Sequence, residues 1–250
     1  MPKKVFIIYV LLVHAFVVLV LLKSDFIGRV QTKFGLINLK PELTERYSEA
    51  DLKPELTERY HAMIAYHSMM DSNIPENAII FMGDSLTQSL PVSAITPLGV
   101  NFGIGNDTSL AITKRLKQYS SIRRAKIVII AIGLNDLSMM DPNEVIKNNE
   151  NIINSIPPNI DIVFSAVHPV NENFYKQQGR SNERIDQLNS GLKQLCSKYS
   201  NVNFINIAKL LKDETGNLSN EYHIGDGVHL NYYGYKIWIK ELKMKIEEFK

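Results

Sequence analysis

Two short motifs, far apart in the chain, contain the side-chain types that carry out acyl transfer. Ser85 follows a Gly-Asp pair, and Asp226 precedes His229 by three residues. A serine hydroxyl is a weak nucleophile until a nearby base takes its proton, and an imidazole titrates close to neutral pH. A carboxylate three residues before a histidine lies on the same side of a turn, where it can hold the Nδ1–H. The pattern predicts a catalytic triad of Ser85, His229 and Asp226.

Acyl transfer through a serine also needs hydrogen-bond donors for the oxyanion of the tetrahedral intermediate. Loss of one such donor typically costs ~10²–10³ in turnover. The candidate donors are the Ser85 backbone N–H, a backbone N–H in the glycine-rich residues 103–106, and the side-chain amide of Asn135. Glycine lets a backbone approach a ligand closely. Gly105 and Asn106 are both candidates for the second donor, and the sequence leaves the choice between them open.

The elements that must position these residues alternate between strands and helices. Several short runs are apolar on both faces, as strands buried in a parallel sheet are. The alternation predicts an α/β fold, a three-layer doubly wound (flavodoxin-like) arrangement around a five-stranded parallel sheet. Ligands of such folds bind at the carboxyl ends of the strands, where the motifs fall. The expected strands are residues 78–82, 99–102, 126–132, 161–167 and 202–207, and the expected helices are residues 109–119, 142–155, 182–199 and 232–249.

Each motif also has a non-catalytic interpretation. Ser85 alone suits a helix N-cap, Asn135 suits a turn or cap, and the Asp226–His229 pair suits a surface turn. His223, Asp226 and His229 could also be metal ligands, but the motifs at the other strand ends would then have no role. The occurrence of all the motifs in order favours catalysis. The sequence has no G-x-S-x-G, P-loop or H-E-x-x-H motif.

Three segments resemble motif blocks of the SGNH/GDSL hydrolase family of esterases and lipases. They are FMGDSLTQ (81–88), IGLNDL (132–137) and DGVHLNYYGY (226–235), and the resemblance covers roughly residues 78–250. It implies a serine esterase that works through an acyl-enzyme, with Asn135 as an oxyanion donor and with no cofactor and no metal. One block departs from the family pattern: VNFGIGNDTS (100–109) has Asn106 where the family has the donor glycine, and Gly105 comes one residue earlier.

The substrate is only weakly indicated. Asp84, beside the nucleophile, and His168, after the fourth strand, are candidate substrate contacts, although His168 also suits a structural role. Residues 168–184 form a polar stretch with Phe174 and Tyr175, and no large apolar insertion is present. We therefore expect a short-acyl ester on a glycan or small molecule. Lysophospholipase, thioesterase and glycan O-acyltransferase activities are the enzymatic alternatives, and an inactive membrane-anchored binding protein is the non-enzymatic one.

Composition excludes several other classes of protein. The chain has 250 residues, and its formal net charge is +2, which gives no case for binding nucleic acid. Its single cysteine excludes an intrachain disulfide and a Cys-based zinc site. Nucleic acid and metal are thus not expected as partners. The expected partners are an ester substrate, which the predicted triad implies, and a membrane.

A membrane is expected because residues 5–22 are apolar and carry no formal charge. As a helix they would span ~27 Å, close to the ~30 Å hydrocarbon core of a bilayer. Lys3 and Lys4 precede this run and favour a cytoplasmic N-terminus, which would place the catalytic domain outside the cytoplasm. A cleaved signal peptide, which would give a secreted protein, and a buried soluble helix are the alternatives.

The predicted domain organisation has three parts. Residues 1–23 form a transmembrane anchor, residues 24–74 a helical stalk, and residues 75–250 the hydrolase domain. The stalk contains LKPELTERY twice, at residues 39–47 and 52–60. Two copies are too few for a solenoid, so we interpret the duplication as lengthening a solvated spacer.

Overall fold

The computed structural model of the chain describes residues 57–177 and 179–249. The predicted anchor, most of the predicted stalk and the first copy of the repeat lie outside the described residues. Within the described ranges, no helix has both the length and the apolar character needed to cross a bilayer.

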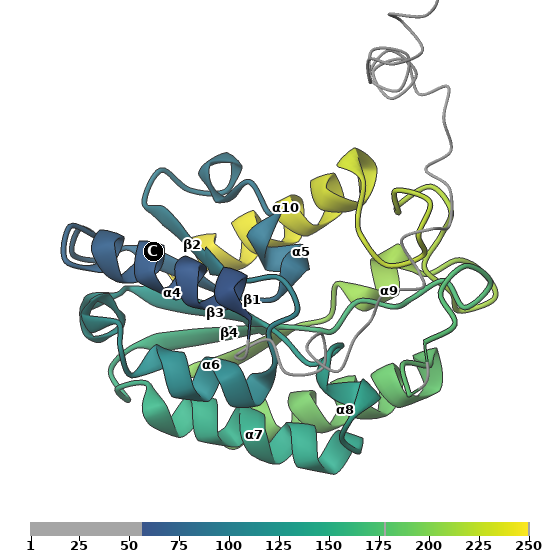
Figure 1. Cartoon of the computed structure of the whole chain (residues 1–250), viewed down its shortest axis with the longest axis horizontal. Helices are drawn as coiled ribbons and strands as arrows, with labels where there is room; N and C mark the ends of the chain where they lie inside the picture. Colours follow the sequence, from purple (N-terminus) through teal and green to yellow (C-terminus); the bar gives the residue numbers. More distant parts are fainter. Residues whose placement is uncertain (1–56, 178, 250) are drawn as a thin grey trace, which may run out of the picture. The chain divides into compact units, whose positions relative to one another are not determined.

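The centre of the described region is a sheet of five parallel strands (Figure 1). The spatial order β2-β1-β3-β4-β5 is that of flavodoxin-like doubly wound folds. Gly83 at the end of β1 pairs with Gly103 of β2 and Ala131 of β3, so the carboxyl ends of these strands are level. The strands are β1 (Ile79–Gly83), β2 (Gly99–Gly103), β3 (Ile127–Ala131), β4 (Asp161–Ser165) and β5 (Val202–Ile205).

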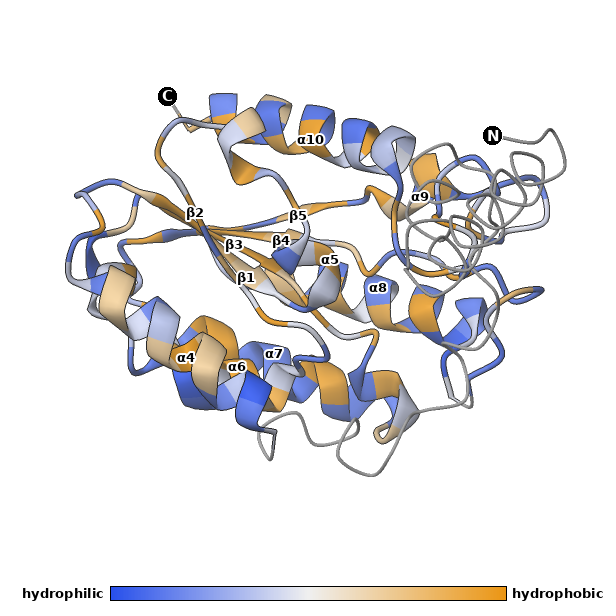
Figure 2. Ribbon diagram, turned by 45° about the horizontal axis from the view of Figure 1, so that its top comes forward, coloured by the Kyte–Doolittle hydropathy of each residue, from blue (hydrophilic) through white to orange (hydrophobic). Residues whose placement is uncertain are grey.

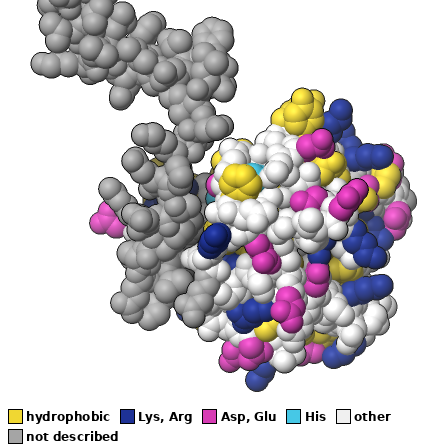
Figure 3. All heavy atoms as spheres, turned by 90° about the vertical axis from the view of Figure 1, so that its right-hand side faces the viewer, with side chains coloured by type: hydrophobic (Ala, Val, Ile, Leu, Met, Phe, Trp, Pro, Cys, Tyr) yellow, Lys and Arg dark blue, Asp and Glu magenta, His cyan; other side chains and the backbone are white. Residues whose placement is uncertain are grey.

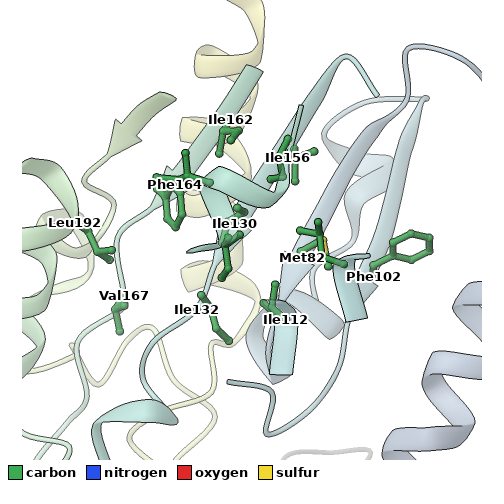
Figure 4. Close-up of a cluster of buried hydrophobic side chains, with 14 of the residues drawn as sticks. Met82, Phe102, Ile112, Ile130, Ile132, Ile156, Ile162, Phe164, Val167 and Leu192 are labelled. Carbon is green, nitrogen blue, oxygen red and sulfur yellow. The ribbon is translucent and has the colours of Figure 1, made fainter. Parts of the chain in front are cut away.

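Helices cover both faces of the sheet, which confirms the predicted arrangement of a parallel sheet between helices (Figure 2). Ile80 and Met82 of β1 face one core cluster with Ile112, part of which is shown in Figure 4. Phe81 faces the other cluster with Trp238. On the first face lie α6 (Ser109–Leu116), α7 (Pro142–Ser155) and α8 (Asn182–Cys196), and on the second lie α9 (Ala208–Leu211) and α10 (Tyr232–Glu247).

Local sequence signals explain where the helices start. Asp141 and Glu144 form a capping box at α7, with Pro142 in the first helical position. Ser181 caps α8 and Asn231 caps α10 by accepting backbone N–H bonds. The predicted bounds of α7 are those observed, whereas α6, α8 and α10 end two or three residues earlier than predicted.

One helix, α4 (Glu58–Asp71), belongs to the domain and not to a solvated stalk. Tyr60 is buried, the ring of His67 lies 4.7 Å from that of Phe102, and Asp71 accepts four hydrogen bonds from two serines of the domain. The boundary predicted at residue 75 is therefore too late. The buried face of α4 consists of Tyr60, His67 and Asp71, so it shows no apolar stripe in the sequence.

Candidate active site

Ser85, His229 and Asp226 form a continuous hydrogen-bonded chain. Ser85 Oγ lies 3.1 Å from His229 Nε2, and His229 Nδ1 lies 2.6 Å from Asp226 Oδ2. A carboxylate only accepts, so Nδ1 carries the proton and Nε2 is free to accept from the serine hydroxyl. Residues that are 144 positions apart in sequence thus meet at the carboxyl end of the sheet.

The serine is positioned by a short helix, α5 (Ser85–Gln88), that directly follows β1. Asp84 caps this helix by accepting the Leu86 N–H at 3.0 Å. The helix packs closely on the end of β2, where a Cβ at Gly103 would lie 2.3 Å from the backbone nitrogen of Gln88. A side chain at Gly103 would therefore displace the helix that carries Ser85.

A compact turn before α10 holds Asp226 and His229. Asp226 Oδ1 accepts the backbone N–H groups of Val228 and His229, both at 2.9 Å. His223 Nδ1 accepts the N–H groups of Gly225 and Gly227, at 3.0 and 3.2 Å. The lone pair on Nδ1 of His223 is therefore used within the turn, which argues against the alternative of a metal site with Asp226 and His229.

Electrostatics favour a charged acid and a basic imidazole. Burial by itself raises the pKa of Asp226, but hydrogen bonds from His229 and Val228 outweigh it and lower that pKa overall. The hydrogen bond to Asp226 raises the pKa of His229 above its usual value, against the effect of burial. The imidazole is thus a stronger base than an isolated histidine, as proton abstraction from a hydroxyl requires.

Apart from the Ser85 N–H, the predicted oxyanion donors lie on the loops after β2 and β3, whose ends are level with the end of β1. Asn135 Nδ2 donates to Asp107 O at 3.0 Å, which fixes the amide, and no residue in the described part of the chain accepts its second N–H. The Gly105 N–H donates to Gln88 Oε1 at 2.6 Å. Asn106 has a positive φ of 65°, and no described residue accepts a hydrogen bond from its N–H. Of the two open candidates, Asn106 therefore has the available donor.

The loop that carries these donors is fixed by a buried ion pair that the sequence did not reveal. Arg115 Nη2 lies 2.7 Å from Asp107 Oδ2, both side chains are almost fully buried, and Tyr60 OH donates to Asp107 Oδ1. Asp136 accepts the N–H and hydroxyl of Ser109, which ties the loop after β3 to α6. In the sequence, Asp107-Thr108 and Asn135-Asp136 identified the two loops. They gave no indication that Arg115, Tyr60 and Ser109 would be the partners of these loops.

The structure places Asp84 and His168 in the interior. Burial raises the pKa of Asp84 to about 7 and lowers that of His168 to about 3, so His168 is neutral. The His168 ring packs edge-on against Trp238 at 4.4 Å, and no described residue bonds to either ring nitrogen. Both side chains line a cavity of about 10 Å³ behind the serine. The sequence analysis named both as candidate substrate contacts, with a structural role as the alternative for His168; their burial, the cap that Asp84 provides for α5 and the packing of His168 on Trp238 favour structural roles.

Comparison with known proteins gives one family. A model of the GDSL-like lipase/acylhydrolase family matches residues 81–237, which is more than half of the chain. This range contains Ser85, Asn135, Asp226 and His229, and it begins after α4. No curated protein sequence matches the chain significantly.

Solved structures share the fold. A protein from Streptococcus pneumonia, described as a platelet activating factor, is 28% identical, with a TM-score of 0.70 over 78% of this chain and 96% of its own. A lipase/acylhydrolase from Enterococcus faecalis is 21% identical, with a TM-score of 0.59 over 68% of this chain and 96% of its own. A mutant of Axe2, an acetyl-xylooligosaccharide esterase from Geobacillus Stearmophilus, is 18% identical, with a TM-score of 0.54 over 68% and 94%. The last two similarities concern the fold alone.

Proposed function

The chain belongs to the GDSL-like lipase/acylhydrolase family and is an ester-bond hydrolase, and from this premise we propose that it cleaves a short-acyl carboxylic ester through Ser85, His229 and Asp226. The observation that carries the proposal is the hydrogen-bonded chain from Ser85 Oγ through the imidazole to the Asp226 carboxylate. The lowered pKa of Asp226 keeps its carboxylate charged, and the raised pKa of His229 makes its neutral imidazole a stronger base.

The reaction proceeds in two halves. Ser85 Oγ attacks the ester carbonyl carbon while His229 Nε2 takes its proton, and the carbonyl oxygen becomes an oxyanion. The imidazolium then protonates the departing alkoxide, which leaves as an alcohol, and the acyl group stays on Ser85. In the second half a water molecule attacks this acyl-enzyme, again with His229 as base, and the acid leaves as Ser85 regains its proton. Asp226 holds the imidazole tautomer and stabilises the imidazolium throughout.

Three donors support the oxyanion in this proposal. The backbone N–H groups of Ser85 and Asn106 and the free N–H of the Asn135 amide lie on the loops around the nucleophile. Gly105 supports the site differently, because its N–H holds Gln88. Preorganised donors of this kind supply a large part of the rate enhancement in acyl transfer.

The surroundings of the serine support a short acyl group. The cavity behind Asp84 and Leu86 measures about 10 Å³, too small for a hydrocarbon chain. A larger cavity of about 370 Å³ lies between α8, β5 and α9, and none of the triad residues lines it. The triad is instead open to solvent, with the His229 side chain 39% exposed. A small acyl group with a hydrated alcohol, such as a glycan, suits an open site.

A lipid-like ester is the second candidate, and exposed apolar side chains favour it. Phe174 packs against Gly227 beside the catalytic turn, and Phe174 and Ile224 are each 51% exposed. Acidic and basic side chains are interspersed on the face shown in Figure 3, so charge alone does not distinguish a lipid alcohol from a sugar.

Chain-length preference separates the two candidates. We expect kcat/KM for 4-nitrophenyl esters to be highest for acetate or butyrate and to fall steadily towards palmitate, because the cavity beside Asp84 and Leu86 measures only about 10 Å³. Initial rates across this series measure the preference, and Ser85→Ala protein gives the background. A maximum at long chains would contradict the short-acyl proposal and favour the lipid-like ester.

We also propose that the apolar residues 5–22 anchor the enzyme in a membrane, with the hydrolase domain outside the cytoplasm. The support is the length and lack of charge of this run. Protease added to intact cells is expected to digest the hydrolase domain, and alkaline carbonate is expected to leave the chain in the membrane pellet. Release of an intact soluble protein into the medium would instead indicate cleavage of the segment.

A further inference from the structure

Arg59 of α4, the helix that precedes the family-matched region, lies close to the loop beside Ser85. A Cβ placed on Gly105 would lie 3.7 Å from Arg59 Nη2, 3.9 Å from Ser85 Cβ and 3.1 Å from Gln88 Oε1. The guanidinium of α4 and the nucleophile therefore border the same space. Residue 105 itself adds no side chain to that space, and the Gln88 side chain, held by the Gly105 N–H, lies along its edge.

Arg59 lies on α4, a helix that is bound to the rest of the domain at both of its ends. Its neighbour Tyr60 is buried and donates to Asp107 Oδ1 at 3.2 Å, and Asp107 is paired with Arg115. At the other end, Asp71 is bound by Ser120 and Ser121, so the helix is fixed at both ends. The second copy of the LKPELTERY repeat thus ends in Arg59 at the site and Tyr60 in the domain interior, and it does more than lengthen a spacer.

The charge of Arg59 is available for a ligand. The side chain is exposed, and it forms no ion pair with any residue among 57–177 and 179–249. Three carboxylates of the site have other partners: Asp107 is paired with Arg115, Asp226 with His229, and the buried Asp84 accepts the Leu86 N–H. A guanidinium presents several N–H donors in a planar fork that matches a carboxylate or a phosphate.

We propose that Arg59 binds an anionic group, a carboxylate or a phosphate, carried by the ester substrate close to the scissile carbonyl. This inference rests on the proposed function of Ser85 and deepens it by naming the charge class of the substrate. The anion can belong to the acyl part or to the alcohol part of the ester. Hydrogen bonds to charged groups contribute enough to change kcat/KM by roughly ten-fold or more when one is lost.

Matched neutral and anionic esters test the proposal with the full chain. The acyl-side pair is 4-nitrophenyl butyrate and mono-4-nitrophenyl succinate, and the alcohol-side pair is 1-butyrylglycerol and its 3-phosphate. The variants are Arg59→Gln, Arg59→Lys and the control Arg123→Gln, which changes an exposed arginine in the turn Ser120–Arg124 at the far end of α4. In Arg59→Gln, we expect kcat/KM to fall about ten-fold for one anionic ester, mainly through KM, and to stay unchanged for both neutral esters.

Arg59→Lys should recover part of the loss, and Arg123→Gln should behave as wild type. Equal losses on neutral and anionic esters would overturn the proposal, because Arg59 would then act on the oxyanion or on the fold. No selective loss on either anionic ester would overturn it as well. The pair that responds identifies the acyl or the alcohol side as the source of the anion.

A binding measurement separates this proposal from the proposed function. Succinate and glycerol 3-phosphate are titrated calorimetrically into Ser85→Ala protein with and without Arg59→Gln. Weaker binding of one anion after the Arg59 change supports the anion site even if wild-type protein hydrolyses none of the esters, an outcome that would count against the esterase proposal alone. Equal binding of both anions to the two proteins counts against the anion site alone.

Discussion

Ser85→Ala is expected to lower kcat for 4-nitrophenyl acetate by about 10⁴-fold or more, because the variant lacks the oxygen that forms the acyl-enzyme. In the structure, the Ser85 hydroxyl bonds with His229 at 3.1 Å and with no other described side chain. Its removal should therefore leave the fold intact, with a change in stability within about 0.5 kcal/mol. Steady-state kinetics and a thermal melt measure the two quantities.

A covalent probe provides a second readout of the same residue. A fluorophosphonate should form a phosphonate ester at Ser85 Oγ with loss of fluoride, and the Ser85→Ala protein should remain unlabelled. Ser89→Ala is the matched control, since Ser89 directly follows the same short helix and has no bond to His229. Retained hydrolysis in Ser85→Ala would assign the nucleophile to another residue. Unlabelled wild-type protein beside a labelled serine esterase would contradict the esterase mechanism.

Asp226→Asn is expected to reduce kcat by about 10⁴-fold while preserving the turn. Asparagine can still accept a backbone N–H from Val228 or His229 through its oxygen. Its NH₂ group would then donate to His229 Nδ1, which forces the imidazole proton onto Nε2. An Nε2–H cannot accept the Ser85 proton, so the base is lost although the geometry remains.

The Asp226→Asn change should also shift the pH dependence of kcat/KM in a defined direction. In wild type, kcat/KM should rise with pH as His229 loses its proton, with an apparent pKa above the ordinary value of 6.5, because Asp226 favours the charged imidazolium. Without that carboxylate the pKa of His229 should fall, so any residual activity should persist to lower pH. Asp213→Asn is the control, because Asp213 also accepts backbone N–H groups in a turn but has no bond to an imidazole. An unshifted acid limb in Asp226→Asn would contradict the assigned role.

The sequence predicted the parts of the site that depend on strand order. Parallel strands bring their carboxyl ends to one edge, so the residues after β1, β2 and β3 had to converge. The register confirms this, because Gly83 lies level with Gly103 and Ala131. Strand order alone does not place His229 beside Ser85, because the turn that holds it follows no neighbouring strand; that approach was expected from the chemistry of a Ser-His-Asp set and from the family resemblance. The catalytic roles of these residues stay predictions until the variants above are measured.

Other features depend on contacts that leave no periodic signal. The burial of α4 rests on Tyr60, His67 and Asp71, and each is buried only because a polar or aromatic partner exists far along the chain. Hydrophobic patterning therefore classed this helix as solvated. The sequence also could not decide whether Gly105 or Asn106 is the second oxyanion donor. That decision required the position of Gln88, whose side chain accepts the hydrogen bond of the Gly105 N–H.

The attachment of α4 also determines which end of the domain is suited to fusion or immobilisation. Its first turn, with Arg59, borders the entrance to the nucleophile, so everything upstream of Thr57 joins the domain beside that entrance. The final helix α10 starts three residues after His229 and runs for 16 residues, so its far end lies ~24 Å along its axis from the turn that holds His229. A bulky fusion partner or solid support joined directly ahead of Thr57 would obstruct incoming molecules, whereas one joined at the carboxyl end would leave the approach clear.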